Sequence, residues 1–235
     1  MAGTLTRRKP VVPTQTPGLH SGDLLAQEEF HRRYLSEKRD LKLELIDGVV
    51  FMASPVGAAH GRYQARLVHL LSHYESFTAG AAAVSEATVI LDSGNEVRPD
   101  AALLLLPDSG GKTGLTEEGY ITGGPEWVGE VAHSSVAIDL HRKKAAYQRA
   151  GVLEYCVVCV AEQKIEWFHF KSRRRITPDS QGVLRSRVFP GLWINGPALL
   201  ANAGRPLIAT LEAGLASPEH ADFLRRLNAR QTKEN

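Results

Sequence analysis

Apolar residues along the chain alternate with polar ones in several short runs and recur every three or four positions in longer stretches. Two β-prone runs within residues 43–52 flank Asp47-Gly48, a dipeptide typical of a hairpin turn. Between residues 57 and 78 the three-to-four-residue spacing predicts a helix with one broad apolar stripe. An N-cap cluster ahead of several apolar residues predicts another helix over residues 23–35.

The second half of the chain combines further strands with one helix. The pattern predicts strands over residues 84–91, 97–106, 127–132, 154–160 and 165–170, a glycine-rich loop over 107–124 and a helix over 136–150. Because about 20 residues containing that helix connect the strand at 127–132 to the strand at 154–160, those two strands should be parallel. The hairpins require antiparallel pairs, so the expected fold class is α/β with a mixed sheet.

The length and composition are ordinary for a folded globular protein. The chain has 235 residues, of which 43% are hydrophobic and 23% are charged. Residues 1–20 contain three prolines and few large apolar residues, so we expect a flexible tail there. Residues 21–205 should form one main domain, and residues 206–235 should form a C-terminal helical extension or tail.

Several sequence features bear on location and partners. No apolar run approaches the ~18 residues of a membrane span, and the first residues lack the apolar core of a secretory signal. Two cysteines cannot form a disulfide framework. These features favour a cytoplasmic protein with no membrane partner. The formal net charge of +2 permits a nucleic-acid partner without requiring one, because local charged patches matter more than the total.

Two acidic residues stand in neighbouring apolar strands. Asp100 lies near the start of one predicted strand and Glu130 lies inside the next. Burying an unpaired carboxylate is costly, and two adjacent carboxylates repel each other unless a cation or a proton lies between them. Oxygen ligands of this kind suit Mg²⁺, which needs only one or two carboxylates. In the alternative interpretation both acids face solvent, or pair with Arg98 or Arg142.

A charged pair follows on the predicted helix over residues 136–150. Asp139 and Lys143 are four residues apart, a spacing that stabilises isolated helices by a few tenths of a kcal/mol. In a second interpretation Lys143 extends over the end of the sheet toward Glu130, where its charge would stabilise a phosphate during transfer. The spacing alone leaves both interpretations open.

Six short motifs occur in one order along the chain. They are Leu43-Glu44-Leu45-Ile46-Asp47-Gly48, a helix-opening His60, Arg98-Pro99-Asp100, Glu130-Val131, Lys143 with Tyr147, and Ala150-Gly151-Val152 ahead of Tyr155. In this order they resemble the Uma-two family of restriction endonuclease-like proteins, part of the PD-(D/E)xK nuclease superfamily, over roughly residues 22–200. The resemblance implies a nuclease-like αβββαβ core with a mixed sheet, preceded here by an extra N-terminal helix and β-hairpin.

The resemblance also implies roles for individual residues. Asp100 and Glu130 would be the two metal-binding acids, and the carbonyl of Val131 would be a further ligand of Mg²⁺, with Mn²⁺ as a substitute. The superfamily places its lysine two residues after the second acid, where this chain has Ala132. The resemblance therefore assigns the lysine role to Lys143 on the following helix.

Three other residues are additional candidates. Lys144 ranks behind Lys143, because its side chain points about 100° away on the helix. Glu44 matches an acidic position of the family in the first hairpin, where it would join the metal ligands. His60 matches a histidine at the start of a helix, with either a catalytic or a supporting role.

Together these features indicate a Mg²⁺-dependent endonuclease that hydrolyses phosphodiester bonds of DNA, with duplex DNA as the expected substrate. Because cutting a duplex requires two cuts on antiparallel strands, a homodimer is expected, with residues 23–54 as its contact surface. The alternative function is a non-catalytic DNA-binding or assembly protein on a nuclease-like scaffold. A Mg²⁺-binding titration separates the two.

Three other motifs have weaker interpretations. Residues 106–113 end in Gly-Lys-Thr like a phosphate-binding loop, but Leu106 replaces the first glycine and no helix is expected to follow. Cys156 and Cys159 are three residues apart on a predicted strand, so their side chains should face opposite sides. His69 and His73 have a feasible metal-ligand spacing but no third ligand nearby. All three are expected to be structural.

Overall fold

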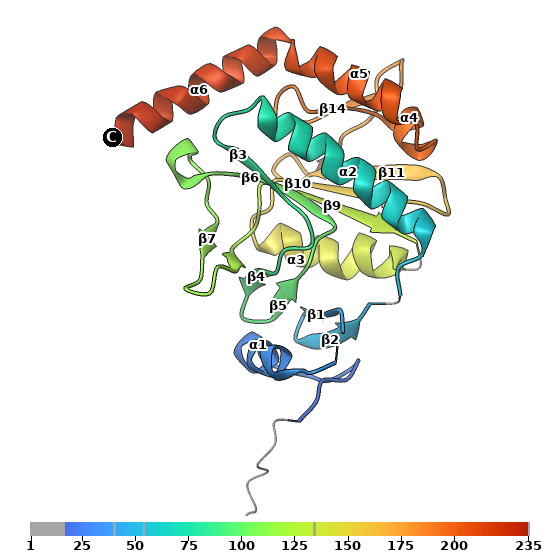
Figure 1. Cartoon of the computed structure of the whole chain (residues 1–235), viewed down its shortest axis with the longest axis vertical. Helices are drawn as coiled ribbons and strands as arrows, with labels where there is room; N and C mark the ends of the chain where they lie inside the picture. Colours follow the sequence, from blue (N-terminus) through green and yellow to red (C-terminus); the bar gives the residue numbers. More distant parts are fainter. Residues whose placement is uncertain (1–16, 40, 54, 134, 235) are drawn as a thin grey trace, which may run out of the picture.

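The computed structural model describes residues 17–39, 41–53, 55–133 and 135–234. At its centre lies a six-stranded sheet in the order β12-β11-β10-β9-β6-β3 (Figure 1). Its strands are β3 (Ala81–Val84), β6 (Ala101–Leu105), β9 (Trp127–Ala132), β10 (Glu154–Cys159), β11 (Lys164–His169) and β12 (Arg174–Arg175). The β9–β10 pair is parallel, as predicted, and the other pairs are antiparallel.

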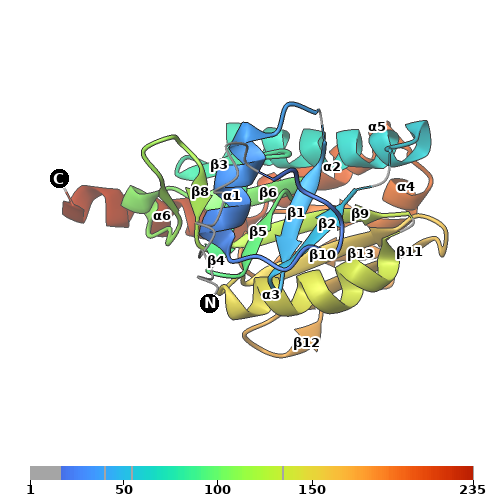
Figure 2. The same cartoon turned by 90° about the horizontal axis from the view of Figure 1, so that it is seen from below.

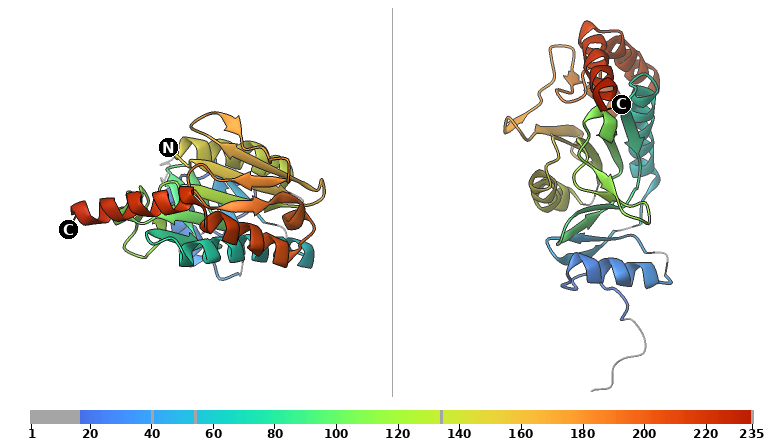
Figure 3. Two further views of the ribbon diagram at one scale, coloured as in Figure 1. Left: turned by 90° about the horizontal axis from the view of Figure 1, so that it is seen from above. Right: turned by 90° about the vertical axis from the view of Figure 1, so that its left-hand side faces the viewer.

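Helices cover one face of this central sheet. They are α2 (Ala58–Ser76), α5 (Gly204–Leu215) and α6 (Pro218–Glu234), which lie together on one side in Figure 3. Successive side chains of a strand point to opposite faces, so Trp127 and Val131 of β9 pack in the core under these helices. The apolar stripe of α2 and side chains of α5 and α6, including Leu211 and Phe223, complete that core.

The opposite face of the central sheet is covered by the helix after β9 and by a second sheet. That helix has a π-helical segment, η2 (Ile138–Lys143), followed by α3 (Lys144–Arg149). The second sheet consists of β2 (Val49–Met52), β1 (Leu43–Ile46), β5 (Asn95–Val97), β4 (Val89–Asp92), β8 (Ile121–Thr122) and β7 (Gly114–Leu115) in that order. Val128 and Ala132 of β9 pack in this second core together with Tyr147 of α3.

The N-terminal helix α1 (Gln27–Ser36) packs on the outer side of the second sheet, beside the β1–β2 hairpin (Figure 2). Its Phe30 is buried against Leu43, Leu45 and Val50 of the hairpin. Of the predicted tail, residues 1–16 lie outside the described residues, whereas Leu19 is buried in this same small cluster.

The chain order α2, β3, β6, β9, α3, β10 is the αβββαβ order expected from the sequence, and the sheet is mixed as expected. The strands of the second sheet are inserted between these core elements. The remaining elements are η1 (Pro107–Ser109), β13 (Val183–Arg185), β14 (Trp193–Asn195) and α4 (Gly196–Leu200). Within the described residues, no helix has both the length and the apolar character that crossing a membrane requires.

Two predicted strands were wrong in extent, because each is divided between the two sheets. Residues 84–91 contain the end of β3 and the start of β4, with Glu86 at a φ of 54° between them. Residues 97–106 contain the end of β5 and all of β6, separated by Arg98-Pro99-Asp100. Proline has no N–H to donate to a ladder, so pairing stops there and resumes in the other sheet. This break places Asp100 at the edge of the central sheet.

The glycine-rich loop contains no phosphate-binding helix, as the sequence indicated. The 3₁₀ turn η1 is followed by the short strands β7 and β8. Gly111 lies directly against the carbonyl of Leu105, and a Cβ there would fall 1.8 Å from that oxygen. The glycine that imitates a nucleotide-binding motif is therefore required by a tight backbone turn.

Candidate active site

One cavity of about 440 Å³ opens between the β1–β2 hairpin, the start of α2 and η2. Its lining includes Glu44, His60, Asp100, Glu130, Val131 and Lys143. Thus six of the seven residues selected from the sequence surround one space, although they come from five different elements or loops. The seventh, Lys144, has its ammonium 3.9 Å from the centre of the Phe168 ring and does not line this cavity.

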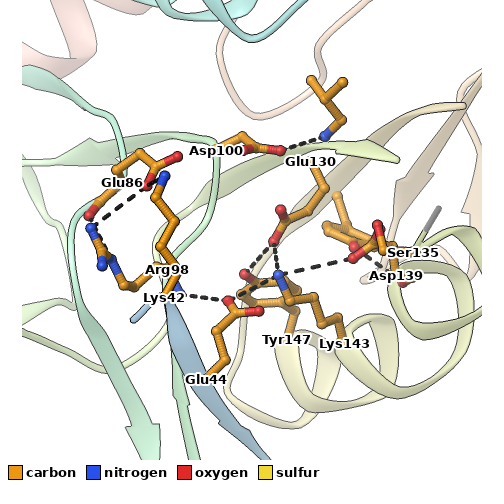
Figure 4. Close-up of polar contacts among 12 residues, drawn as sticks. Lys42, Glu44, Glu86, Arg98, Asp100, Glu130, Ser135, Asp139, Lys143 and Tyr147 are labelled. Carbon is orange, nitrogen blue, oxygen red and sulfur yellow. Dashed lines mark hydrogen bonds and ion pairs between the residues drawn. The ribbon is translucent and has the colours of Figure 1, made fainter. Parts of the chain in front are cut away.

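The two acids predicted to bind metal lie at adjacent strand ends. Ala101 of β6 pairs with Gly129 of β9, so the antiparallel ladder brings Asp100 next to Glu130. Asp100 is buried, and its Oδ2 accepts the backbone N–H of Val131 at 2.7 Å (Figure 4). The alternative pairing with Arg98 or Arg142 is wrong for both acids. The Arg98 guanidinium approaches Glu86, and the Arg142 guanidinium lies over Phe51.

Glu130 is buried and points from β9 toward α3. The ammonium of Lys143 and the hydroxyl of Tyr147 both donate to its Oε1, at 3.0 and 2.8 Å. Burial raises the pKa of Glu130 well above its usual range, and the neighbouring carboxylates add to that effect against the opposing charge of Lys143. A second cation would therefore stabilise the ionised form of this carboxylate.

Lys143 is the hub of the polar cluster. Its Nζ lies 2.9 Å from Glu44 Oε1, 3.0 Å from Glu130 Oε1 and 3.9 Å from Asp139 Oδ1. Burial opposes the charge of the ammonium, but these carboxylates raise the pKa of Lys143 well above its ordinary value. Lys143 does pair with Asp139, as the four-residue spacing suggested, but both side chains are buried in the protein rather than exposed to solvent.

The π-helical segment aims both members of the Asp139–Lys143 pair at the cavity. π-Helical turns occur mostly as single widened turns and often lie at functional sites. The hydroxyl of Tyr155 donates to the backbone carbonyl of Asp139 at 3.0 Å, which satisfies a group in the widened turn. The hydroxyl of Ser135 donates to the Asp139 carboxylate and fixes its orientation.

Comparison with protein families yields a match over most of the chain. The family model described as Uma2, "Putative restriction endonuclease", matches residues 27–200. The chain belongs to the Uma2 family. This confirms the family expected from the order of the sequence motifs, and the core order of the Uma2 chain agrees with the PD-(D/E)xK superfamily.

A solved structure has a similar fold. It is a crystal structure described as a putative nuclease belonging to DUF820 from Anabaena variabilis ATCC 29413, with a TM-score of 0.58 and 13% identity. The match covers 73% of this chain and 97% of that one. At this identity the likeness shows the fold alone. A search of curated proteins found no match to this Uma2 chain.

The charges in the Uma2 site do not balance. The carboxylates of Glu44, Glu130 and Asp139 share the buried ammonium of Lys143, and Asp100 adds a fourth carboxylate to the same cavity. Buried charges without partners are strongly unfavourable, so protons or a cation must offset the excess of negative charge.

A histidine partly offsets this charge. His60 Nε2 lies 3.5 Å from Asp100 Oδ2. The hydrogen bond and charge of Asp100 raise the pKa of His60. The other ring nitrogen, Nδ1, is buried and has no hydrogen-bond partner among the described residues. The Asp100 carboxylate, which is expected to bind a metal, thus already faces His60, whose ring is positively charged when protonated.

The available ligands suit a hard divalent cation. Within the described part of the chain, no three His, Cys, Asp or Glu side chains form a metal-binding group. A cation here would instead rely on Asp100, Glu130, the carbonyl of Val131 and water. All are oxygen ligands, and Mg²⁺ accepts such sites because it keeps several waters. The residues of the Uma2 site therefore fit Mg²⁺ or Mn²⁺.

Sequence reasoning missed a second polar group at the cavity. Lys42 donates to one carboxylate oxygen of Glu86 at 2.8 Å, and Gln64 donates to the other at 2.8 Å (Figure 4). Against the effect of burial, these hydrogen bonds lower the pKa of Glu86. Its partners lie 22 and 44 residues away in sequence, so no local pattern indicates the contact.

Tyr147 supports Glu130 through one hydrogen bond that a substitution can remove. Tyr147→Phe keeps the ring in the core but withdraws the hydroxyl from Glu130 Oε1. We expect this variant to lose about 1.5–3 kcal/mol of unfolding free energy in urea titrations, the usual value of a hydrogen bond to a charged group. Unchanged stability would contradict this role. Tyr155→Phe is the matched control, because the hydroxyl that it removes donates to the backbone carbonyl of Asp139 and not to Glu130.

Proposed function

We propose that this protein is a divalent-metal-dependent endonuclease that hydrolyses phosphodiester bonds of DNA. The observation that carries the proposal is the buried cluster at the floor of the cavity, in which Asp100 and Glu130 stand at adjacent strand ends beside Lys143. Membership of the Uma2 family supports the same reaction class. The excess of carboxylates gives the cluster a physical reason to bind a cation.

Each side chain has a distinct task in this proposal. Asp100, Glu130 and the Val131 carbonyl hold the cation, which supplies positive charge against the scissile phosphate when bound. Tyr147 keeps Glu130 oriented toward the cavity through its hydrogen bond to Oε1. Lys143 donates to the same oxygen and provides an ammonium that can donate to a phosphate oxygen or orient the attacking water. His60 lines the cavity and supplies its Nε2, beside Asp100 Oδ2, for a proton or a hydrogen bond.

A cleavage assay tests this function. The full chain should cut DNA in the presence of Mg²⁺ or Mn²⁺ and not in EDTA, with plasmid, linear and single-stranded DNA as substrates. Glu130→Gln keeps the shape and the acceptor oxygen of the side chain but removes its charge, so cleavage should disappear while the protein stays folded. Glu166→Gln, on the neighbouring part of the same sheet, is the control and should cleave normally.

Two results would reject the proposal. One is the absence of metal-dependent cleavage of every substrate, and the other is normal cleavage by Glu130→Gln. Binding of DNA and Mg²⁺ without cleavage would instead support the alternative of a non-catalytic DNA-binding or assembly protein. Calorimetric titration with Mg²⁺ and with oligonucleotides measures both.

The proposal includes a homodimer, since two sites related by a two-fold axis match the two strands of a duplex. Residues 23–54 offer the contact, because Leu24, ahead of α1, and Leu35, in α1, are large exposed apolar side chains. Light scattering at micromolar concentration should give twice the monomer mass, and Leu24→Asp should restore the monomer. A monomeric wild-type protein would contradict this prediction.

A further inference from the structure

One side of the cavity mouth is apolar and uncharged. The sequence from residue 48 to residue 59 contains no charged residue, and several residues of this stretch line the cavity. Met52 and Val56 are 43% and 47% exposed, and both line the cavity. Phe51 and Ile138 are half-buried apolar side chains of the same lining. We call Phe51, Met52, Val56 and Ile138 the apolar rim.

The groups expected to react lie far below this rim. Asp100, Glu130 and Lys143 are only 8%, 4% and 5% exposed. The cavity of about 440 Å³ has the size of sites that enclose a small molecule. In a paired duplex the bases are stacked inside and the backbone is held on the outside. The reacting group of a nuclease is the phosphate, and a stiff duplex can bring it to such buried groups only by bending or opening, whereas an unpaired strand can enter the cavity.

The apolar rim also lacks what a duplex backbone requires. Proteins that bind duplex DNA neutralise several phosphates with lysine and arginine, and this term dominates their affinity. The uncharged stretch at residues 48–59 cannot provide it. Aromatic rings and arginine planes, in contrast, are the surfaces on which unpaired bases stack. The rim offers such a ring in Phe51, and the Arg142 guanidinium, outside the rim, lies 5.7 Å from the centre of that ring.

We propose that the cavity accepts an unpaired nucleotide, in a single strand or in a locally opened duplex, whose base packs against the apolar rim. This places the adjoining phosphate at Asp100, Glu130 and Lys143. The inference rests on the proposed nuclease function for the reaction, but the binding of an unpaired base is a separate property of the rim.

Equilibrium binding tests the rim without relying on cleavage. The probe is a fluorescently labelled DNA strand of ~15 nucleotides, free or annealed to its complement, with the full-length Glu130→Gln protein. The single strand should bind at least about tenfold more tightly than the duplex. Phe51→Ala, and separately Met52→Ser with Val56→Ser, should weaken single-strand binding roughly 5- to 150-fold, the range of one base-stacking contact.

Leu115→Ser removes a more exposed apolar side chain outside the cavity and should leave the affinity unchanged. The variant with Met52→Ser and Val56→Ser alters only exposed positions, so it tests the proposal even if Phe51→Ala does not fold. Equal affinity for single strand and duplex, or unchanged affinity in the rim variants, would overturn the proposal. The proposal would also be overturned if the variant with Met52→Ser and Val56→Ser changed from dimer to monomer while its affinity for the single strand stayed unchanged. The apolar rim would then be an interface between copies of the chain.

Cleavage of matched substrates provides the second test. A duplex with an unpaired central bubble should be cut within the bubble, whereas the fully paired duplex of the same sequence should resist. Equal cleavage of both would overturn the inference and leave the nuclease function intact. If the wild-type protein cleaves no DNA, the nuclease function fails, and the binding measurements still decide whether the rim holds an unpaired base.

Discussion

Replacing Lys143 by alanine should destabilise the protein by about 3–5 kcal/mol near neutral pH and abolish cleavage. The substitution removes the one ammonium that contacts the buried carboxylates of Glu44, Glu130 and Asp139. Breaking a buried ion pair costs this much because the remaining charges are left without a partner. Urea unfolding measures the loss of stability, and cleavage is assayed at a temperature at which the variant is still folded.

The size of this loss should depend on pH. Burial raises the pKa values of Glu130 and Asp139, so these carboxylates take up protons in the folded variant at mildly acidic pH. Protonation removes the uncompensated charge, and the destabilisation should therefore be smaller at about pH 5 than at about pH 8. A loss that does not change with pH would indicate that packing rather than charge is responsible.

Lys144→Ala separates the two adjacent lysines. Lys144 stacks on Phe168 away from the cavity, so its removal should cost about 1 kcal/mol or less and leave cleavage intact. If Lys144→Ala were inactive and Lys143→Ala active, the assignment of the lysine would be wrong. If both were fully active, no lysine on this helix would take part in the reaction.

The position of Lys143 explains why the usual lysine of the superfamily motif is absent. Ala132 is fully buried in the core between the central sheet and α3. Its small side chain leaves room for the helix, which brings Lys143 and Tyr147 to Glu130. The four-residue spacing of Asp139 and Lys143 predicted that they share one face of a helix, and their contact confirms that placement.

Other parts of the fold and site had no local signal in the sequence. Apolar runs predicted strands correctly but did not show that residues 84–91 and 97–106 cross between two sheets. Sheet membership depends on pairing with distant segments, which propensity does not encode. The sequence predicted a helical extension or tail over residues 206–235 but did not show that α5 packs against α2 and β14, because these contacts are non-local. The contact between Glu86 and Lys42 is equally non-local.

Glu154→Gln should make the protein more stable at about pH 8 by about 2–3 kcal/mol, and change its stability little at about pH 5. Glu154 is fully buried at the start of β10 and does not line the cavity. Its carboxylate accepts hydrogen bonds from the Ser186 hydroxyl and the Arg187 N–H, both at 2.7 Å. Burial outweighs these bonds and raises the pKa of Glu154 to about 7.

The sign follows from proton uptake. Between about pH 4.5 and pH 7 the unfolded chain has already released this proton, while the folded protein still holds it, so stability falls as pH rises through that range. Glutamine cannot ionise, and its amide oxygen can still accept the backbone N–H of Arg187. The stability difference between variant and wild type, measured by urea unfolding across this range, isolates the titration of Glu154 from that of all other groups.

A stability difference between Glu154→Gln and wild type that is flat with pH would contradict this prediction, because it would show that the Glu154 carboxylate ionises in the folded protein as easily as in the unfolded chain. Cleavage by Glu154→Gln should stay normal in either case, since Glu154 is separated from the cavity along β10, whose Val157 is the residue that pairs with Glu130.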